Sequence, residues 1–303
     1  WAGLDESYLA VQEFENTGVS SPFSCFFSMP NVTTAACSQL WNLRGYQNTP
    51  VAACATGTIA IGEAYDAIRF GRASMMLAGA GESLNSVCAI WNIDVLGALS
   101  RETSSPERAS CPFSLQRSGF VLSEGGAVLC LEERESALAR GATILAEVTG
   151  YANFSDAVDF TSPAEDCVAR EQTIRWALRA ADLQPADLDY INAHGTSTPL
   201  NDINETRSLK KALGDEAYRI PVSSTKAYSG HLIAAAGSFE TIVCLQAMAA
   251  GIMPATAHLT QPDPQCDLDY IAEGHRQGEI RRALNLSFGF GGANAALVLE
   301  KHG

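Results

Sequence analysis

One cysteine lies where an expected strand gives way to an expected helix. The apolar run 49–53 predicts a short strand, and 55–70 predicts a mostly apolar helix closed by Gly71. Cys54 would occupy the first turn of that helix, where free backbone N–H groups and the positive end of the helix dipole lower a thiol's pKa. Its small neighbours leave the sulfur open to a substrate, which favours covalent catalysis. A buried structural cysteine accounts equally well for the same local residues.

Two histidines also lie at expected strand-to-helix junctions. His194 follows the predicted strand 188–192, and His231 opens the predicted helix 231–249. A histidine at a helix N-terminus is disfavoured as a cation, so we expect His231 to be neutral and able to donate one hydrogen bond. A lone histidine is usually structural. Two at such junctions, like Cys54, indicate a ligand site, because ligands bind at these edges of α/β sheets.

A glycine-rich turn separates the last two predicted strands. The run NLSFGFGGAN at 285–294 joins the strand predicted over 283–287 to the one predicted over 295–299. No helix with a Lys-Ser/Thr pair follows, so the run is a poor phosphate-binding loop. A tight hairpin explains the glycines, and the exposed N–H groups of such a turn can also bind an oxyanion.

Apolar strands and helices alternate along the chain in two blocks of similar order. This pattern predicts an α/β fold with a parallel sheet covered on both faces, in two packed halves that form one catalytic domain. The segment 84–116 is irregular and predicts a cap over the sheet, and Asp202 is the expected cap of the helix 203–213. The remaining predicted strands are 74–80, 120–132, 142–153 and 221–224, and the remaining predicted helices are 31–43 and 164–181.

Composition excludes several classes of protein. The 303 residues carry a formal net charge of −14, which argues against a nucleic-acid binder, although a local basic patch for an acidic partner is possible. Nine cysteines without a CxxC pair fit neither a disulfide framework nor a zinc site, and they suit free thiols in the cytoplasm. We find no signal peptide and no apolar run approaching about 18 residues, so no membrane association is expected.

Four motifs together resemble one enzyme family. Cys54 in ACATG, His194 in NAHGTSTP, the run SSTKAYSGH at 223–231 and NLSFGFGGAN occur in the order and spacing of the elongating β-ketoacyl-acyl carrier protein synthases. The resemblance covers essentially the whole chain. It implies a thiolase-like fold of two similar βαβαβ-type halves in α-β-α-β-α layers, one spanning about 1–135 and the other 136–303, in a single catalytic domain.

The resemblance assigns roles to four of these residues. Cys54 matches the nucleophile that accepts the acyl chain, and His194 and His231 match the pair that binds the malonyl thioester carbonyl and promotes decarboxylation. Lys226 matches the lysine that supports this pair. Two neutral imidazole donors would stabilise the enolate as its charge develops. The implied chemistry requires no metal and no redox cofactor.

Two further roles follow from the same resemblance. Glu240 in AGSFE matches the acidic partner of the family's lysine. Phe290 matches a gating phenylalanine whose backbone N–H, with that of Cys54, forms the oxyanion hole. Ordinary core packing would also explain this aromatic residue.

The family implies an acyl carrier protein as partner, in its acyl and malonyl forms, and a homodimer whose two-fold interface lies beside the strand 49–53. The chain departs from the family pattern at two positions before Arg117. The family usually has Arg where this chain has Cys111, and Asp where it has Ser114. The first could weaken carrier docking and the second could change how Arg117 is held. The chain opens on Trp1, and we expect an N-terminal portion of the family domain, on the order of 60 residues or more, to be missing.

Three alternatives stay open. A ketosynthase of a type II polyketide or aryl polyene pathway would use the same chemistry on another chain. A non-catalytic partner subunit that sets chain length is disfavoured, because such subunits have typically lost the cysteine. A thiolase is disfavoured as well, because thiolases use a second catalytic cysteine near the C-terminal glycine-rich loop, and this chain has none there.

Overall fold

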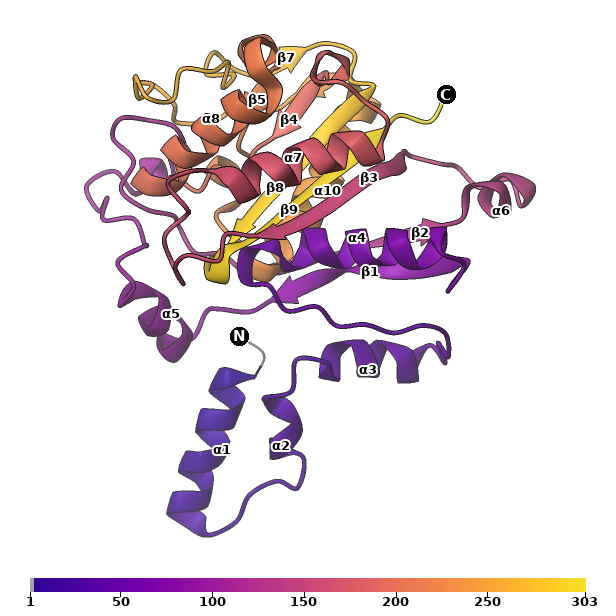
Figure 1. Ribbon diagram of the computed structural model, residues 1–303. Helices are drawn as coiled ribbons and strands as arrows, with labels where there is room; N and C mark the ends of the chain where they lie inside the picture. Colours follow the sequence, from indigo (N-terminus) through magenta and orange to yellow (C-terminus); the bar gives the residue numbers. More distant parts are fainter. Residues whose placement is uncertain (1–2) are drawn as a thin grey trace.

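A five-stranded mixed sheet forms the centre of the molecule. The computed structural model describes residues 3–303 (Figure 1). The strands lie in the order β3-β9-β8-β4-β5, with β3–β9 and β9–β8 antiparallel and β4 parallel to both β8 and β5. Their bounds are β3 Glu147–Ser155, β4 Tyr190–Asn192, β5 Val222–Ser223, β8 Arg282–Gly289 and β9 Ala293–Glu300.

Successive side chains of the strands point to alternate faces of this sheet, and helices cover both faces. In β9, Val298 packs in the same apolar cluster as Ile174 of α7, whereas its neighbour Leu297 packs with Ile61 of α4. Successive side chains of a strand point to opposite faces, so one apolar strand can contact two helical layers. The helices concerned are α7 Val168–Ala180 and α8 Pro199–Leu213 in one layer, and α4 Thr56–Arg69 and α10 Ala236–Ala250 in the other.

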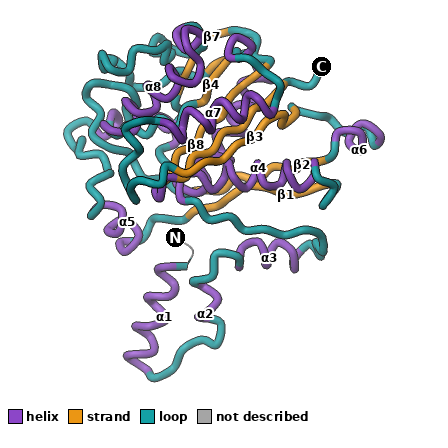
Figure 2. Tube along the Cα trace, in the orientation of Figure 1, coloured by secondary structure: helices purple, strands orange, loops and turns teal. Residues whose placement is uncertain are grey.

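A second, smaller sheet lies beyond α4 and α10. Strands β1 (Met75–Glu82) and β2 (Gly125–Glu132) pair antiparallel beside α4 (Figure 2). Strand β1 packs on α4, and β2 packs on both α4 and α10. The α/β class is therefore confirmed. The parallel sheet expected for the first half is not formed within residues 3–303, where this half contributes only the antiparallel pair.

The segment 49–53 is not a strand. Ala53 has a φ of 45°, which is not extended backbone, and the N–H of Ala52 donates to Thr56 Oγ1 at 2.9 Å instead of to a neighbouring strand. No other described segment pairs with 49–53, and Val51 is 70% exposed. An apolar run becomes a strand only where a partner satisfies its backbone groups, and the described residues supply none here.

Two predicted helix starts are also wrong. Helix α8 begins at Pro199, and Thr198 Oγ1 caps it, so Asp202 lies inside the first turn instead of preceding it. Proline suits the first helical position because the N–H that it lacks would have no partner there. Helix α10 begins at Ala236, after the 3₁₀ turn η5 (Ile233–Ala235), so His231 precedes the helix instead of opening it.

The remaining elements lie around this core. Strands β2 and β3 begin about five residues later than the starts predicted for them, at 120 and 142. Helices α1 and α2 lie side by side and, with α3, extend away from the body (Figure 1). The other bounds are α1 Leu4–Thr17, α2 Ser24–Phe27, α3 Val32–Leu40, α5 Val87–Asp94, α6 Arg134–Ala139, α9 Lys226–Ser229, β6 Ile252–Met253 and β7 Arg276–Gln277.

One segment is long and apolar enough to cross a membrane by length and composition. It covers Ile233–Ala250, which corrects the expectation that no apolar run approaches this length. In the structure 56% of the segment is buried, and α10 packs between β8 and β2. The helix is apolar because sheets cover it from two sides.

Candidate active site

Cys54 lies in a 3₁₀ turn that runs directly into α4. The turn η1 spans Ala53–Ala55, and the cysteine is 4% exposed. The end of β8 comes so close to this turn that a Cβ on Gly289 would stand 2.6 Å from the backbone oxygen of Ala52. Glycine at this position therefore lets the end of β8 approach the cysteine.

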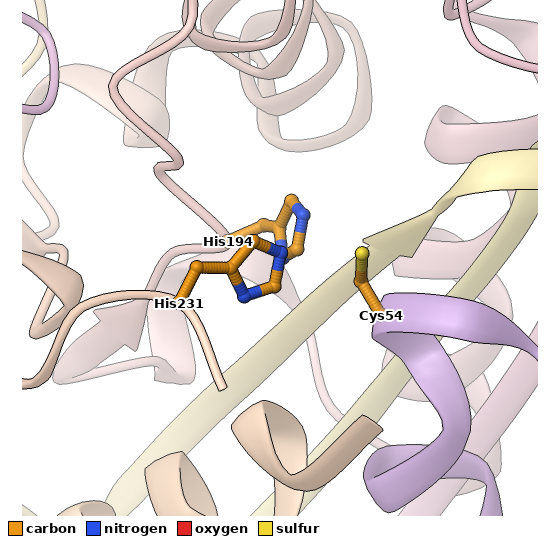
Figure 3. Close-up of side chains that lie close together, drawn as sticks. All are labelled: Cys54, His194 and His231. Atoms are coloured by element: carbon orange, nitrogen blue, oxygen red, sulfur yellow. The ribbon is translucent and has the colours of Figure 1, made fainter. Parts of the chain in front are cut away.

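The two histidines converge on Cys54 from β4 and from the segment before η5. Figure 3 shows both imidazole rings facing the thiol. The ligating atoms of Cys54, His194 and His231 all lie within 4.8 Å of one another, and the two rings have centroids 5.4 Å apart. The structure thus brings together three side chains separated by 140 and 37 residues of sequence (194 − 54 and 231 − 194).

Backbone contacts hold each histidine in place. Glu205 of α8 accepts hydrogen bonds from the N–H groups of His194 and Gly195, at 2.7 and 2.8 Å, and so fixes the loop after β4. His231 Nδ1 accepts from the N–H of Ile233 at 3.2 Å. Because Nδ1 acts as an acceptor, a neutral His231 carries its proton on Nε2 and can donate from there.

Both imidazoles are neutral. Burial lowers the pKa of His194 and of His231 well below the usual range, and the nearby cation of Lys226 acts in the same direction. This outcome agrees with the expectation for His231, although its cause is burial and not a helix terminus.

The thiol departs from the sequence expectation. Burial raises the pKa of Cys54 to about 11, although Lys226 and the backbone N–H groups of Phe290 and Cys54 itself favour the thiolate. The prediction that the helix end lowers this pKa is therefore wrong for the free thiol. Removing a thiolate from water outweighs the partial charges of a few N–H groups.

A buried ion pair lies behind the histidines. Lys226, in the first turn of α9, donates to Glu240 of α10, and both side chains are 1% exposed. Burial raises the pKa of Glu240 to about 7, against the opposing effect of Lys226. The Lys226 cation thus lies beside the two imidazoles, where it adds to the effect of burial in lowering their pKa.

The glycine-rich run forms the turn between β8 and β9. Phe290 opens the short turn η6 (Phe290–Gly292), is partly buried and packs in the same apolar cluster as Cys54. Its N–H and that of Cys54 both approach the thiol. Two N–H groups directed at one sulfur are suitably placed for the oxygen of a thioester formed on it.

A cavity of about 380 Å³ opens above these residues. Cys54, both histidines and Phe290 line one part of it, and the loop 160–163 lines another. The volume falls in the range of small-molecule sites. Thiolate and imidazole are also ligands for metal ions such as Zn²⁺, so Cys54, His194 and His231 could bind one, which would occupy the sulfur.

The two departures from the family pattern lie close to this site. Arg117 Nη1 donates to Asp263 at 2.7 Å, and its Nε lies 3.5 Å from Asp202, so two neighbouring carboxylates hold the guanidinium. Ser114 contributes only its backbone oxygen, which accepts from Arg117 Nη1 at 2.7 Å. Cys111 is 6% exposed, and its N–H donates to Ser197 Oγ at 3.0 Å. The position of Cys111 therefore presents no side chain to a docking partner.

Two other residues of the site were not predicted from the sequence. Arg170 of α7 and Asn201 of α8 both line the cavity. Arg170 lies in a helix of mixed polarity, where an arginine is ordinarily a solvated residue, and only its 6% exposure in the structure reveals it.

Family models match most of the chain. Residues 2–137 match the family described as the N-terminal domain of beta-ketoacyl synthase, and residues 145–260 match its C-terminal domain. The 3-oxoacyl-[acyl-carrier-protein] synthase 2 of Synechocystis is 42% identical over 93% of this chain and 68% of its own length. A putative polyketide beta-ketoacyl synthase 1 of Streptomyces halstedii is also 42% identical, over 89% of this chain and 64% of its own length.

Solved structures give the same result. A ketosynthase bound to a hexaketide, in complex with its type II polyketide acyl-carrier protein, superposes with a TM-score of 0.95 at 35% identity, over 99% of this chain and 75% of that one. A beta-ketoacyl synthase from Burkholderia phymatum gives 0.92, also at 35% identity, over 98% and 72%. The fold is thiolase-like α/β, and the chain belongs to the β-ketoacyl synthase family of acyl-transferring condensing enzymes.

Proposed function

We propose that this chain elongates acyl chains in fatty acid synthesis, by decarboxylative condensation of an acyl group on Cys54 with malonyl-acyl carrier protein. One observation carries the proposal: a buried thiol and two neutral imidazoles lie within 4.8 Å of one another in the wall of a substrate-sized cavity. The name of the Synechocystis relative supports the fatty acid pathway.

In the first half-reaction the sulfur of Cys54 attacks the acyl thioester. The N–H groups of Cys54 and Phe290 stabilise the oxyanion. The carrier thiolate leaves and takes up the proton that the Cys54 thiol gave up. One thioester replaces another, so this transfer is nearly balanced in energy and reversible.

In the second half-reaction the malonyl thioester carbonyl accepts hydrogen bonds from the two imidazoles. Loss of CO₂ leaves an enolate on that oxygen, and neutral donors stabilise its charge as it forms. The enolate carbon attacks the acyl-Cys54 carbonyl, and the Cys54 thiolate leaves. Burial, assisted by Lys226 in its pair with Glu240, keeps His194 and His231 neutral and therefore able to donate.

An acyl carrier protein delivers both substrates in this proposal, and the hexaketide-bound ketosynthase with a similar structure is in complex with its own acyl-carrier protein. We further propose a homodimer in the cytoplasm. Nine free cysteines suit a reducing compartment.

Mass spectrometry of the acylated protein tests the nucleophile. After incubation with an acyl-carrier thioester, the acyl mass is expected on the peptide that contains Cys54, and Cys54→Ala abolishes both labelling and condensation. Cys130→Ala is the matched control, because that exposed cysteine lies on β2, outside the cavity. Acyl mass on another cysteine contradicts the assignment.

A polyketide ketosynthase is the second candidate, because the Streptomyces halstedii relative is as similar as the fatty acid enzyme. The two differ in product. With malonyl-carrier alone and no reducing enzymes, a fatty acid enzyme releases a single β-keto extension. A polyketide enzyme extends the same chain repeatedly.

A further inference from the structure

A cation in the wall of the active-site cavity has no role in the reaction described above. Arg170 is 6% exposed and lines the cavity. Its Nη1 donates to Asn201 Oδ1 at 3.0 Å, whereas its Nε is buried without a partner. Among residues 3–303 no carboxylate lies within ion-pair distance of this guanidinium. A buried charge in this state is expensive unless an anion joins it.

Three acids, Glu205, Asp156 and Asp202, act on the charge of Arg170, and all of them direct oxygens at other donors. Asp156, which also lines the cavity, accepts from Asn294 Nδ2 at 2.8 Å and from the N–H of Ala164 at 3.3 Å. Glu205 accepts from the N–H groups of His194 and Gly195, at 2.7 and 2.8 Å. Asp202 accepts from the N–H of Phe113 at 2.8 Å and lies 3.5 Å from Arg117. Their charges favour a cation at this place. Their hydrogen bonds go to other donors, however, so the N–H groups of Arg170 that do not bind Asn201 are left for a ligand.

Arg170 stands one aromatic ring away from the reacting groups. Its guanidinium carbon lies 4.1 Å from the ring centroid of Phe288, and that ring meets His194 with centroids 5.8 Å apart. An anion held by Arg170 would therefore lie close to a thioester carbonyl bound by His194.

We propose that Arg170 binds the carboxylate of the incoming malonyl unit and so selects malonyl over uncharged thioesters. This inference rests on the proposed function. Of the groups which that reaction brings into the cavity, only this carboxylate carries a negative charge beside the thioester. The phosphate of the carrier arm lies at the arm's far end. The contact ends when CO₂ leaves, so it contributes to binding malonyl and not to the rate of decarboxylation.

Binding to the inactive Cys54→Ala protein tests the contact directly. We expect malonyl-pantetheine to bind more tightly than acetyl-pantetheine, and Arg170→Met to weaken only the malonyl ligand, by roughly 10- to 100-fold, as for a charge-assisted hydrogen bond. Arg175→Met is the control, because that α7 arginine is exposed and pairs with Glu171. Equal loss for both ligands, or no loss, overturns the proposal. If Arg170→Met weakens the binding of acetyl-coenzyme A alone, which carries phosphates that pantetheine lacks, Arg170 binds a phosphate and the proposal is overturned.

Steady-state kinetics give a second readout with Cys54 present. Arg170→Met should raise the KM for malonyl-carrier by a similar factor, with kcat within about twofold, and Arg170→Lys should recover part of the loss. Thermal stability should stay level or rise, because methionine replaces a buried charge at similar volume. A fall in stability with kcat and KM both impaired indicates a structural arginine.

If the unsubstituted enzyme forms no β-ketoacyl product, the proposed function fails. If it forms product while Arg170→Met keeps the malonyl preference, only this inference fails.

Discussion

At the scale of single residues, burial favours the neutral forms of the side chains of Cys54, His194 and His231. It lowers the pKa of both imidazoles and raises that of the thiol, because a charged group loses its hydration in each case. The free enzyme therefore rests with a protonated Cys54 beside two neutral histidines. Lys226 and the N–H groups around the sulfur then assist the thiolate when a substrate arrives.

The pH dependence of alkylation tests this resting state. Only the thiolate reacts with iodoacetamide, and below its pKa the thiolate fraction grows about tenfold per pH unit. The pKa of Cys54 is raised from its usual value of 9.0 to about 11, so its alkylation rate should still rise between pH 9 and 10. The raised pKa also means that stability contributed by the protonated thiol is complete below pH 9 and is lost as pH rises through 11. An alkylation rate that no longer rises above pH 8 would show that Cys54 is already a thiolate and would contradict the prediction.

The histidines should matter more for malonyl than for acyl loading. His194→Ala and His231→Ala each remove a donor to the enolate oxygen, which should slow malonyl decarboxylation about 10²- to 10³-fold. Loading of Cys54 should stay measurable, because Lys226 and two backbone N–H groups still favour its thiolate. Acyl-enzyme formation and CO₂ release are measured separately, with His275→Ala as the control outside the cavity. A variant that cannot be acylated at all refutes this division of labour.

At the scale of elements, the turn after β8 contains backbone that can change conformation at little cost. Gly291 and Gly292 have φ values of 80° and 77°, and glycine adopts such backbone at little cost. Phe290 stands beside them, partly buried, between the apolar cluster around Cys54 and the cavity. A change of backbone here would move both the ring and the N–H that approaches the sulfur.

We therefore predict that Phe290 gates the acyl pocket. Crystals of free and acylated enzyme should differ in loop 288–292, with the ring displaced when a chain enters. Phe290→Ala should disturb the order of substrate entry more than it lowers thermal stability, because the ring is only partly buried. A core residue would keep one rotamer in both crystals. Its loss would cost about 3–5 kcal/mol of stability while leaving turnover normal.

At the scale of the whole molecule, apolar surface concentrates near the start of the chain. Helices α1 to α3 and the segments around them carry exposed apolar side chains, among them Leu9, Phe14, Phe23, Leu40 and Trp41, and Val51 is exposed just before the nucleophile. Apolar patches of this kind mark surfaces that bind protein.

A second copy of the chain is our proposed occupant of this surface. Light scattering of the intact protein should show a dimer, and Val51→Glu should shift it towards monomer, because a charge would be buried at the interface. Val168→Glu places the same charge on α7, away from this surface, and should leave the dimer intact. A stable, active monomer at micromolar concentration contradicts the prediction.

The sequence by itself determined the fold class and the candidate catalytic residues. Local pattern was sufficient for α4 and for the β8–β9 hairpin, because the helical run, its closing glycine and the alternation of the strands are encoded in contiguous residues. Motif order was sufficient to select Cys54, His194 and His231, which the structure brings together.

Only the tertiary structure decided the features that depend on burial or on a distant partner. The segment 49–53 has strand composition and no strand, because pairing requires a neighbour that no local pattern supplies. The raised pKa of Cys54 and the buried charge of Arg170 follow from exclusion of water by segments far away in the chain. Solvation is set by everything that surrounds a side chain, so residue type and spacing cannot give it.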